Sequence, residues 1–190
     1  VGIDLFNANA QVSASHAAAV DQLSHDPLGE IDRDGKANSL VTAAVRGDGR
    51  IDANDRAIQV DDFRFVADHT SLLPKVAIPS PTMAHFRGGR AGIDIVAYPD
   101  LDRFFDDLAR CYQQEIAALY DAGCRYLQLD DTAWSMMCDP KQREESRGRG
   151  DDPDGLLDVY ADLVNAACSG RPDGMTISLH LCRGNFRSTW

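Results

Sequence analysis

The chain has 190 residues, 44% of them hydrophobic and 26% charged, which is typical of one globular domain with a substantial core. Its net charge of −11 argues against nucleic acid and anionic membrane surfaces as partners, because both bind basic patches. No apolar run approaches the roughly 20 residues of a membrane span, and no signal peptide is visible, so we expect a cytoplasmic protein.

The cysteine content points to a reducing compartment. The five cysteines are odd in number and irregularly spaced, at Cys111, Cys124, Cys138, Cys168 and Cys182. We expect reduced thiols, and we expect any functional one among them to be a metal ligand or a nucleophile.

Residues 1–59 carry little apolar periodicity, apart from a short helix predicted over residues 14–23. The acidic stretch 30–56 is a candidate calcium loop, but neither possible register fits the EF-hand pattern. With Gly49 at the centre, Ala44 would stand at the first ligand position, so a polar surface segment is favoured over a calcium site.

The pattern sharpens from residue 73 onward. Residues 73–82 predict a strand that Pro79 and Pro81 would end. One face of this strand carries Val76, Ile78, Ser80 and Thr82. Residues 98–123 predict a long amphipathic helix, with Asp100 as its N-cap and Gly123 as its stop.

Two more strands and one more helix follow. Residues 124–131 predict the second strand, and residues 151–170 predict the second helix, with Asp152 before Pro153 at its first turn. Residues 175–182 predict the third strand. Between them, the charged stretch 141–154 is interpreted as a mobile surface loop.

This order of strand, helix, strand, helix, strand predicts a parallel sheet. The third strand has one apolar and one polar face, whereas an open doubly wound sheet would be apolar on both. The polar row of the third strand is Thr176, Ser178, His180 and Cys182, and that of the second is Tyr126, Gln128 and Asp130. Such rows suit the interior of a TIM (β/α)8 barrel, whose active site lies at the carboxyl ends of its strands. Three strands cannot close a barrel of eight, so either the early residues hold more strands or this chain is only part of a barrel.

His180 and Cys182 are the strongest candidate metal ligands. They lie two residues apart on one strand, so both side chains point into the same space, and an imidazole with a thiolate suits zinc. Zinc needs three or four protein ligands, so the pair would be half of a site. The alternative is a buried cysteine beside a hydrogen-bonded histidine.

Other polar residues follow the first two strands. Asp130 is expected either to hold a substrate ammonium group or act as a base, or else to cap the following turn, whereas the capping role is favoured for Asp131. The segment 79–90 (PSPTMAHFRGGR) is interpreted either as a site for a carboxylate or phosphate or as a solvated loop. Its candidate substrate-binding residues are Ser80, Thr82, His85 and Arg87. For Cys138, eight residues past Asp130, a solvent-facing thiol is favoured over a place near the site.

Four segments together carry a resemblance to a known family: VDDFRF, PSPTMAHFRGGR, AGCRYLQLDD and LHLCRGNFRSTW. They closely resemble the short, single-barrel members of the cobalamin-independent methionine synthase family, also described as 5-methyltetrahydropteroyltriglutamate–homocysteine methyltransferase-like proteins. The resemblance covers residues 60–190, while residues 1–59 match weakly. It implies a partial TIM barrel of the uroporphyrinogen-decarboxylase/methionine-synthase-like superfamily over residues 60–190.

The resemblance also implies a chemistry. It implies catalytic Zn²⁺ with His180 and Cys182 as ligands, and Asp130 as the residue that holds the amino group of homocysteine. The remaining family ligands, a glutamate and a second cysteine, come from later strands, so we expect this chain to be a fragment that associates with itself through an open sheet edge. The expected function is methyl transfer from methyltetrahydrofolate to homocysteine in methionine biosynthesis. The alternatives are zinc-dependent alkyl transfer to another small thiol and a non-catalytic, truncated homologue that binds a small ligand or partner.

Overall fold

A computed structural model of the chain describes residues 50–51 and 58–183. The helix predicted over residues 14–23 and most of the candidate calcium loop lie outside these described residues. The elements in chain order are α3 (Val60–Asp68), β1 (Val76–Pro79), α4 (Met83–Phe86), the 3-10 turn η3 (Gly89–Gly92), α5 (Leu101–Asp121), β2 (Tyr126–Asp131), α6 (Ala133–Met136), α7 (Pro140–Gly148), α8 (Gly155–Ala167) and β3 (Thr176–Leu181). No helix in this part of the chain is both long and apolar enough to cross a membrane.

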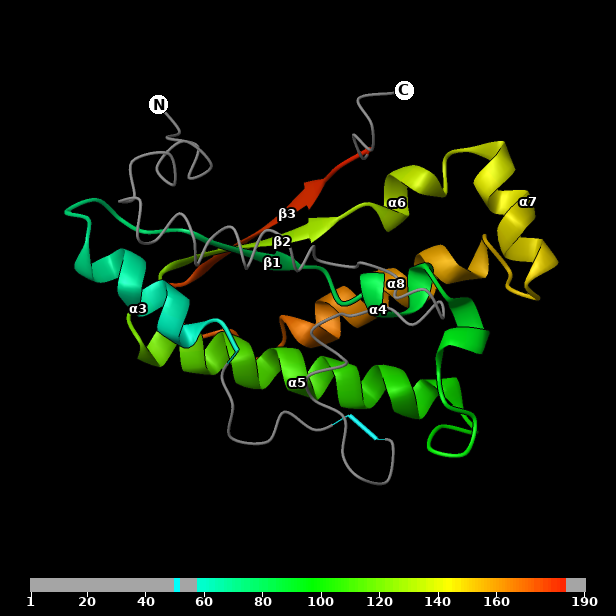
Figure 1. The fold of residues 1–190 in the computed structure, drawn as a ribbon, viewed down its shortest axis with the longest axis horizontal. Coiled ribbons are helices and arrows are strands. Elements are labelled where there is room, and N and C mark those ends of the chain that lie inside the picture. The colour runs from blue at the N-terminus through cyan, green and yellow to red at the C-terminus, as the bar shows by residue number, and fades with distance from the viewer. Residues whose placement is uncertain (1–49, 52–57, 184–190) are drawn as a thin grey trace, which may run out of the picture.

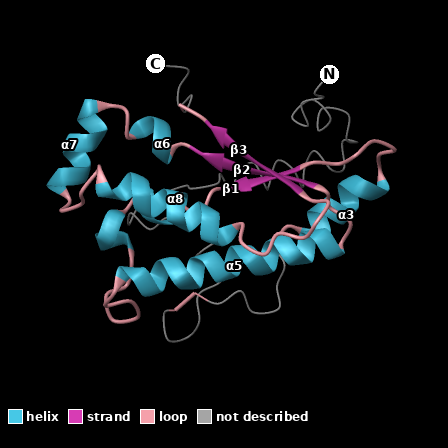
Figure 2. Cartoon of the chain, turned by 180° about the vertical axis from the view of Figure 1, so that it is seen from behind, coloured by secondary structure: helices cyan, strands magenta, loops and turns pink. Residues whose placement is uncertain are grey.

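The three strands form one parallel sheet in the order β1-β2-β3. The chain crosses from β1 to β2 through α5 and from β2 to β3 through α8, and both helices lie on the same side of the sheet (Figures 1 and 2). The predicted alternation of strands and helices is therefore confirmed. Within the described residues the sheet is open, and the eight-stranded barrel stays a prediction.

One face of the sheet packs on these helices and forms the core. Ile78, Leu127 and Leu129 are no more than 1% exposed, and α5 contributes Leu108 and Leu119, which are equally buried. Burying such a side chain contributes about 1.5–3 kcal/mol, so this face fixes how the strands sit on the helices.

The ends of α5 lie where capping residues allow them. The Asp100 carboxylate accepts a hydrogen bond from the backbone N–H of Asp102 at 3.0 Å, which confirms the predicted N-cap. Gly123 follows the helix with φ of +104°, a conformation that a side chain would disfavour. The stop signal in the sequence is therefore confirmed as well.

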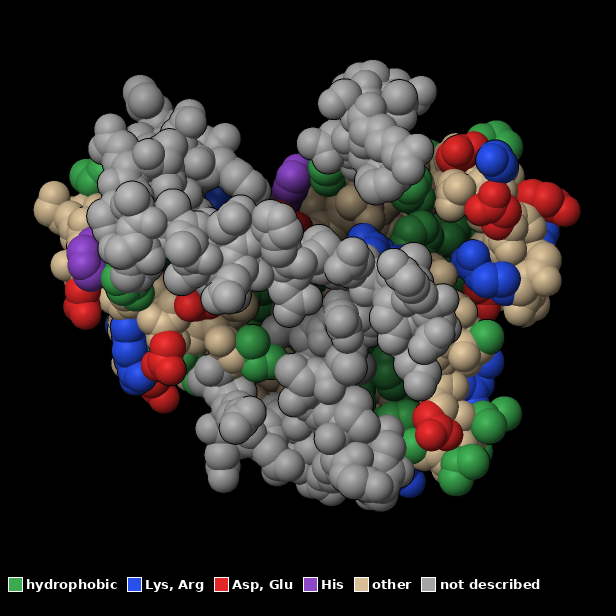
Figure 3. Space-filling view, viewed as in Figure 1, with side chains coloured by type: hydrophobic (Ala, Val, Ile, Leu, Met, Phe, Trp, Pro, Cys, Tyr) green, Lys and Arg blue, Asp and Glu red, His purple; other side chains and the backbone are tan. Residues whose placement is uncertain are grey.

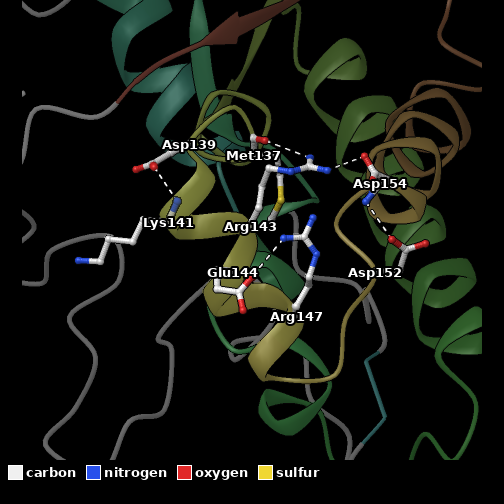
Figure 4. A network of polar contacts seen from close by, with 8 residues as sticks. All are labelled: Met137, Asp139, Lys141, Arg143, Glu144, Arg147, Asp152 and Asp154. Atoms are coloured by element: carbon white, nitrogen blue, oxygen red, sulfur yellow. Dashed lines mark hydrogen bonds and ion pairs between the residues drawn. The ribbon is translucent and has the colours of Figure 1, made fainter.

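The interpretation of residues 141–154 as a mobile loop is wrong, because α7 occupies most of that stretch. The Asp139 side chain caps the helix by accepting from the backbone N–H of Lys141 at 2.9 Å, and Pro140 stands in its first turn (Figure 4). Basic and acidic side chains are interspersed over its surface (Figure 3). The Asp139-Pro140 pair is typical of a helix start, but the high charge content of residues 141–154 led to their interpretation as a loop.

The start of α8 also differs from the prediction. The helix begins at Gly155, so Pro153 lies in the turn before it rather than in its first turn. The Asp152 side chain accepts from the backbone N–H of Asp154 at 3.1 Å and closes that turn. Arg143 of α7 reaches Asp154 at 2.5 Å and joins the two helices (Figure 4).

Candidate functional site

The face of the sheet that points away from α5 and α8 carries the polar residues of β2 and β3. We call it the polar face, and it includes Tyr126, Gln128, Asp130, Ser178 and His180. Along β2 these positions alternate with fully buried ones, as expected when one face packs on helices. Asp130 stands directly beside His180 in the sheet register. The predicted polar rows of the two strands therefore lie side by side.

Asp130 and His180 form the central contact of this face. The His180 Nδ1 atom lies 2.9 Å from the Asp130 Oδ1 atom, and the Gln128 amide donates to the same oxygen at 2.7 Å. The side chains of His180 and Asp130 are 48% and 42% exposed, so both remain accessible to a ligand. A carboxylate on one imidazole nitrogen is the arrangement that orients a histidine for metal binding through its other nitrogen.

Cys182 follows β3 by one residue and continues its hydrogen-bond ladder. Its backbone N–H donates to the carbonyl of Asp131 at 2.8 Å, and its own carbonyl accepts from the Ser135 hydroxyl. Since successive residues of an extended strand alternate, Cys182 and His180 belong to the same face. Ser135 and Asp131 thus hold the end of β3 in place.

Asp131 lies on the opposite face and is completely buried. Its carboxylate accepts from the Thr82 hydroxyl at 2.5 Å and from the backbone N–H of Ala133 at 2.7 Å. The prediction that Asp131 caps the following turn is confirmed. Thr82 also lies 3.3 Å from the Ser80 hydroxyl, and both are buried, so this group joins the end of β1 to that of β2. A role of Ser80 and Thr82 in substrate binding stays a prediction.

The segment 79–90 folds as α4 and η3 rather than as an extended loop. His85 in α4 is 1% exposed, and its Nδ1 atom lies 2.9 Å from the Tyr160 hydroxyl. Burial lowers the pKa of His85 below its ordinary value, with Asp151 acting in the opposite direction. Arg87 follows α4 with its side chain exposed. The structure does not bring His85 onto the polar face, and a substrate contact there stays a prediction.

Lys75 is a residue of the polar face that the sequence interpretation missed. Its ammonium group donates to the Gln128 side-chain oxygen at 2.8 Å and lies 5.4 Å from the centre of the Tyr126 ring. The sequence did contain a signal for this role. Lys75 directly precedes β1, and the neighbouring strand β2 carries a polar residue at every second position.

Among the described residues, the remaining cysteines offer no further ligand beside His180 and Cys182. None of the five forms a disulfide. Cys138 is exposed, as predicted, and burial raises the pKa of both Cys124 and Cys168, which disfavours their thiolates. Within the described ranges no three or more His, Cys, Asp or Glu side chains gather at metal-binding distance. The nitrogen and sulfur donors of His180 and Cys182 suit zinc as two ligands of an incomplete set.

Comparisons with known proteins agree with the resemblance found in the sequence. No protein-family model matches the chain. It is 43% identical to YxjH, an uncharacterized protein of Bacillus subtilis, over 77% of this chain and 38% of that protein. It is 25% identical to the methionine synthase of Pyrococcus furiosus, over 70% of this chain and 32% of that enzyme.

A solved structure shares the fold. A Listeria monocytogenes protein, described as a candidate vitamin-B12-independent methionine synthase, matches 72% of this chain with a TM-score of 0.60 and 39% sequence identity. The match covers 40% of the Listeria chain, so this chain spans well under half the length of each of these relatives. The chain is therefore similar to one part of methionine synthase-like proteins, in both sequence and fold.

Proposed function

We propose that this chain contributes part of the active site of a zinc-dependent enzyme that methylates a small thiol, with homocysteine as the substrate and methyltetrahydrofolate as the methyl donor. The observation that carries the proposal is the contact between Asp130 and His180 at the carboxyl ends of adjacent parallel strands, with Cys182 on the same face. The similarity to methionine synthase-like proteins supports the same chemistry.

The donor set fits the metal. His180 would bind zinc through Nε2, because Asp130 occupies its Nδ1 atom, and Cys182 would bind it through its sulfur. When bound, zinc lowers the pKa of a coordinated thiol, so that the substrate thiolate is available at neutral pH. The remaining ligands would come from outside the described residues, where the family resemblance puts a glutamate and a second cysteine.

Asp130 has a second role in the proposal. Its Oδ1 atom takes both hydrogen bonds from Gln128 and His180, and no hydrogen bond from a described residue reaches Oδ2. An amino acid substrate such as homocysteine carries an ammonium group that Oδ2 would accept. The chain would thus fix the substrate at both ends, and such positioning of reactants lowers the barrier to methyl transfer.

Zinc affinity tests the ligand assignment. We would measure it by competition with a chromophoric chelator for the parent chain and for His180→Ala and Cys182→Ser. At least tenfold weaker binding in each variant is expected, because each removes one ligand. The matched controls are His69→Ala and Cys138→Ser, which alter an exposed histidine and an exposed cysteine that are not assigned as ligands. Unchanged affinity in the two ligand variants would contradict the assignment, and no zinc binding by the parent would mean that the pair binds zinc only together with the missing ligands of a longer protein.

A methyl-transfer assay separates the reactions. Methionine formed from homocysteine and methyltetrahydrofolate, and lost in the ligand variants, would support the full proposal. Turnover of another thiol with zinc bound would show that this thiol, and not homocysteine, is the substrate. Ligand binding without turnover would favour the non-catalytic alternative.

A further inference from the structure

A line of polar contacts runs across the polar face, from the residue before β1 to β3. It begins at Lys75 before β1, passes through Gln128 and Asp130 of β2, and ends at His180 of β3. The three contacts measure 2.8, 2.7 and 2.9 Å in that order. Each residue therefore contacts the next, and the direction of each hydrogen bond follows from which groups can donate.

The first contact orients the Gln128 amide. A lysine ammonium has three donors and no acceptor, so the side-chain oxygen of Gln128 must face it. The NH2 group of the same amide then points at Asp130, where it donates to Oδ1. Tyr126 keeps the Lys75 ammonium in place through the contact with its ring.

The last contact orients the imidazole. An ionised carboxylate only accepts hydrogen bonds, so the proton between Asp130 and His180 must lie on the Nδ1 atom of the histidine. A neutral imidazole carries one N–H group, and its other nitrogen then has a lone pair. No hydrogen bond from the described residues reaches Nε2 of His180.

We propose that Lys75 and Gln128 are positioning residues that act through Asp130 to hold His180 in the tautomer protonated on Nδ1, with Nε2 available as a ligand. The identity of the metal ion rests on the function proposed above, whereas the tautomer does not depend on it. Partners that contact a metal ligand directly, as Asp130 contacts His180, typically change the metal affinity about 10–100-fold, so we expect smaller changes at Gln128 and Lys75.

The tautomer is measured directly by ¹⁵N NMR of the histidine-labelled chain, without metal and at a pH where the imidazole is neutral. The chain has 5 histidines, and the signals of His180 are those that vanish in His180→Gln. We expect the Nδ1–H tautomer in the parent. Lys75→Met and Gln128→Leu release the Asp130 carboxylate from the Gln128 amide that positions it, so we expect a larger share of the Nε2–H tautomer. Lys75→Arg should retain the parent tautomer because arginine also only donates.

Matched controls lie on α7, away from this face. Lys141→Met and Gln142→Leu remove the same residue types at helix positions outside the line of contacts, and they should leave the His180 signals unchanged. An Nε2–H tautomer in the parent would overturn the proposal. So would an unchanged tautomer in both Lys75→Met and Gln128→Leu.

Zinc affinity gives a second readout. Lys75→Met and Gln128→Leu are expected to weaken zinc binding, by less than the roughly 10–100-fold typical of a partner that contacts the ligand itself, while Lys75→Arg stays close to the parent. A shifted tautomer with unchanged zinc affinity would overturn the link to the metal. Since the tautomer is read without metal or substrate, absent methyl transfer would contradict the proposed function and leave this inference standing. Methyl transfer together with an unchanged tautomer in both variants would support the proposed function and contradict this inference.

Discussion

Asp130 and Asp131 are adjacent in β2, yet their side chains belong to opposite faces of the sheet and do different things. Asp131 is fully buried and holds the Thr82 hydroxyl and the turn that begins α6. Asp130 is 42% exposed and contacts His180. The comparison teaches that the helix-covered face supplies stability, whereas the polar face leaves polar side chains accessible at little cost to the fold.

The largest expected effect lies in the core. Leu129→Ala should lower the free energy of unfolding by about 2–5 kcal/mol, because Leu129 is 1% exposed and its loss leaves a cavity. Gln128→Ala, its neighbour on the polar face, should cost about 1 kcal/mol or less. Urea unfolding followed by circular dichroism measures both. Equal losses would mean that the two faces do not differ in this way.

The two aspartates give the next test. Asp131→Ala should cost about 1–3 kcal/mol, because it leaves a buried hydroxyl and a buried N–H group without their acceptor. Asp130→Ala should cost about 0–1 kcal/mol, since it removes a half-exposed pair, but it should weaken zinc binding. The same unfolding experiment checks the pair, and a cost for Asp130→Ala as large as that for Asp131→Ala would break the comparison.

A pH dependence should come from His85, on the buried side. Burial lowers its pKa in the folded state, and the charges of Arg149 and Arg90 lower it further against the opposing effect of Asp151. The unfolded chain then binds a proton more readily, so stability is complete above about pH 6.5 and falls as the pH drops through that value toward the lower folded pKa.

Unfolding midpoints between pH 5 and pH 8 check this, in the parent and in His85→Gln. The variant should lose less stability on acidification than the parent. His69→Gln removes an exposed histidine, retains His85 and serves as the control. A steeper loss in His85→Gln than in the parent would contradict the sign of the shift.

The smallest effect on stability is expected at His180. Its side chain is 48% exposed and its one carboxylate contact is worth about 0–1 kcal/mol, so His180→Gln should unfold close to the parent. A loss of several kcal/mol would show that the histidine belongs to the structural framework, and it would weaken the case for a ligand-binding role.

The sequence by itself determined the strands, the two long helices and the division of the sheet into an apolar and a polar face. Periodicity is a local property, and it predicted α5 with its cap at Asp100 and its stop at Gly123. Alternation along β3 likewise put His180 and Cys182 on one face. The helix α7 was missed because its charges outweighed the Asp139-Pro140 signal.

Only the tertiary structure decided which residues meet. The register between β2 and β3 sets Asp130 beside His180, although 50 residues separate them along the chain. Tertiary packing also buries Ser80, Thr82 and His85. Such contacts depend on how strands pair and helices pack across long sequence distances, and neither composition nor local periodicity encodes a partner so far away. The contact of Lys75 with Gln128 is of the same kind.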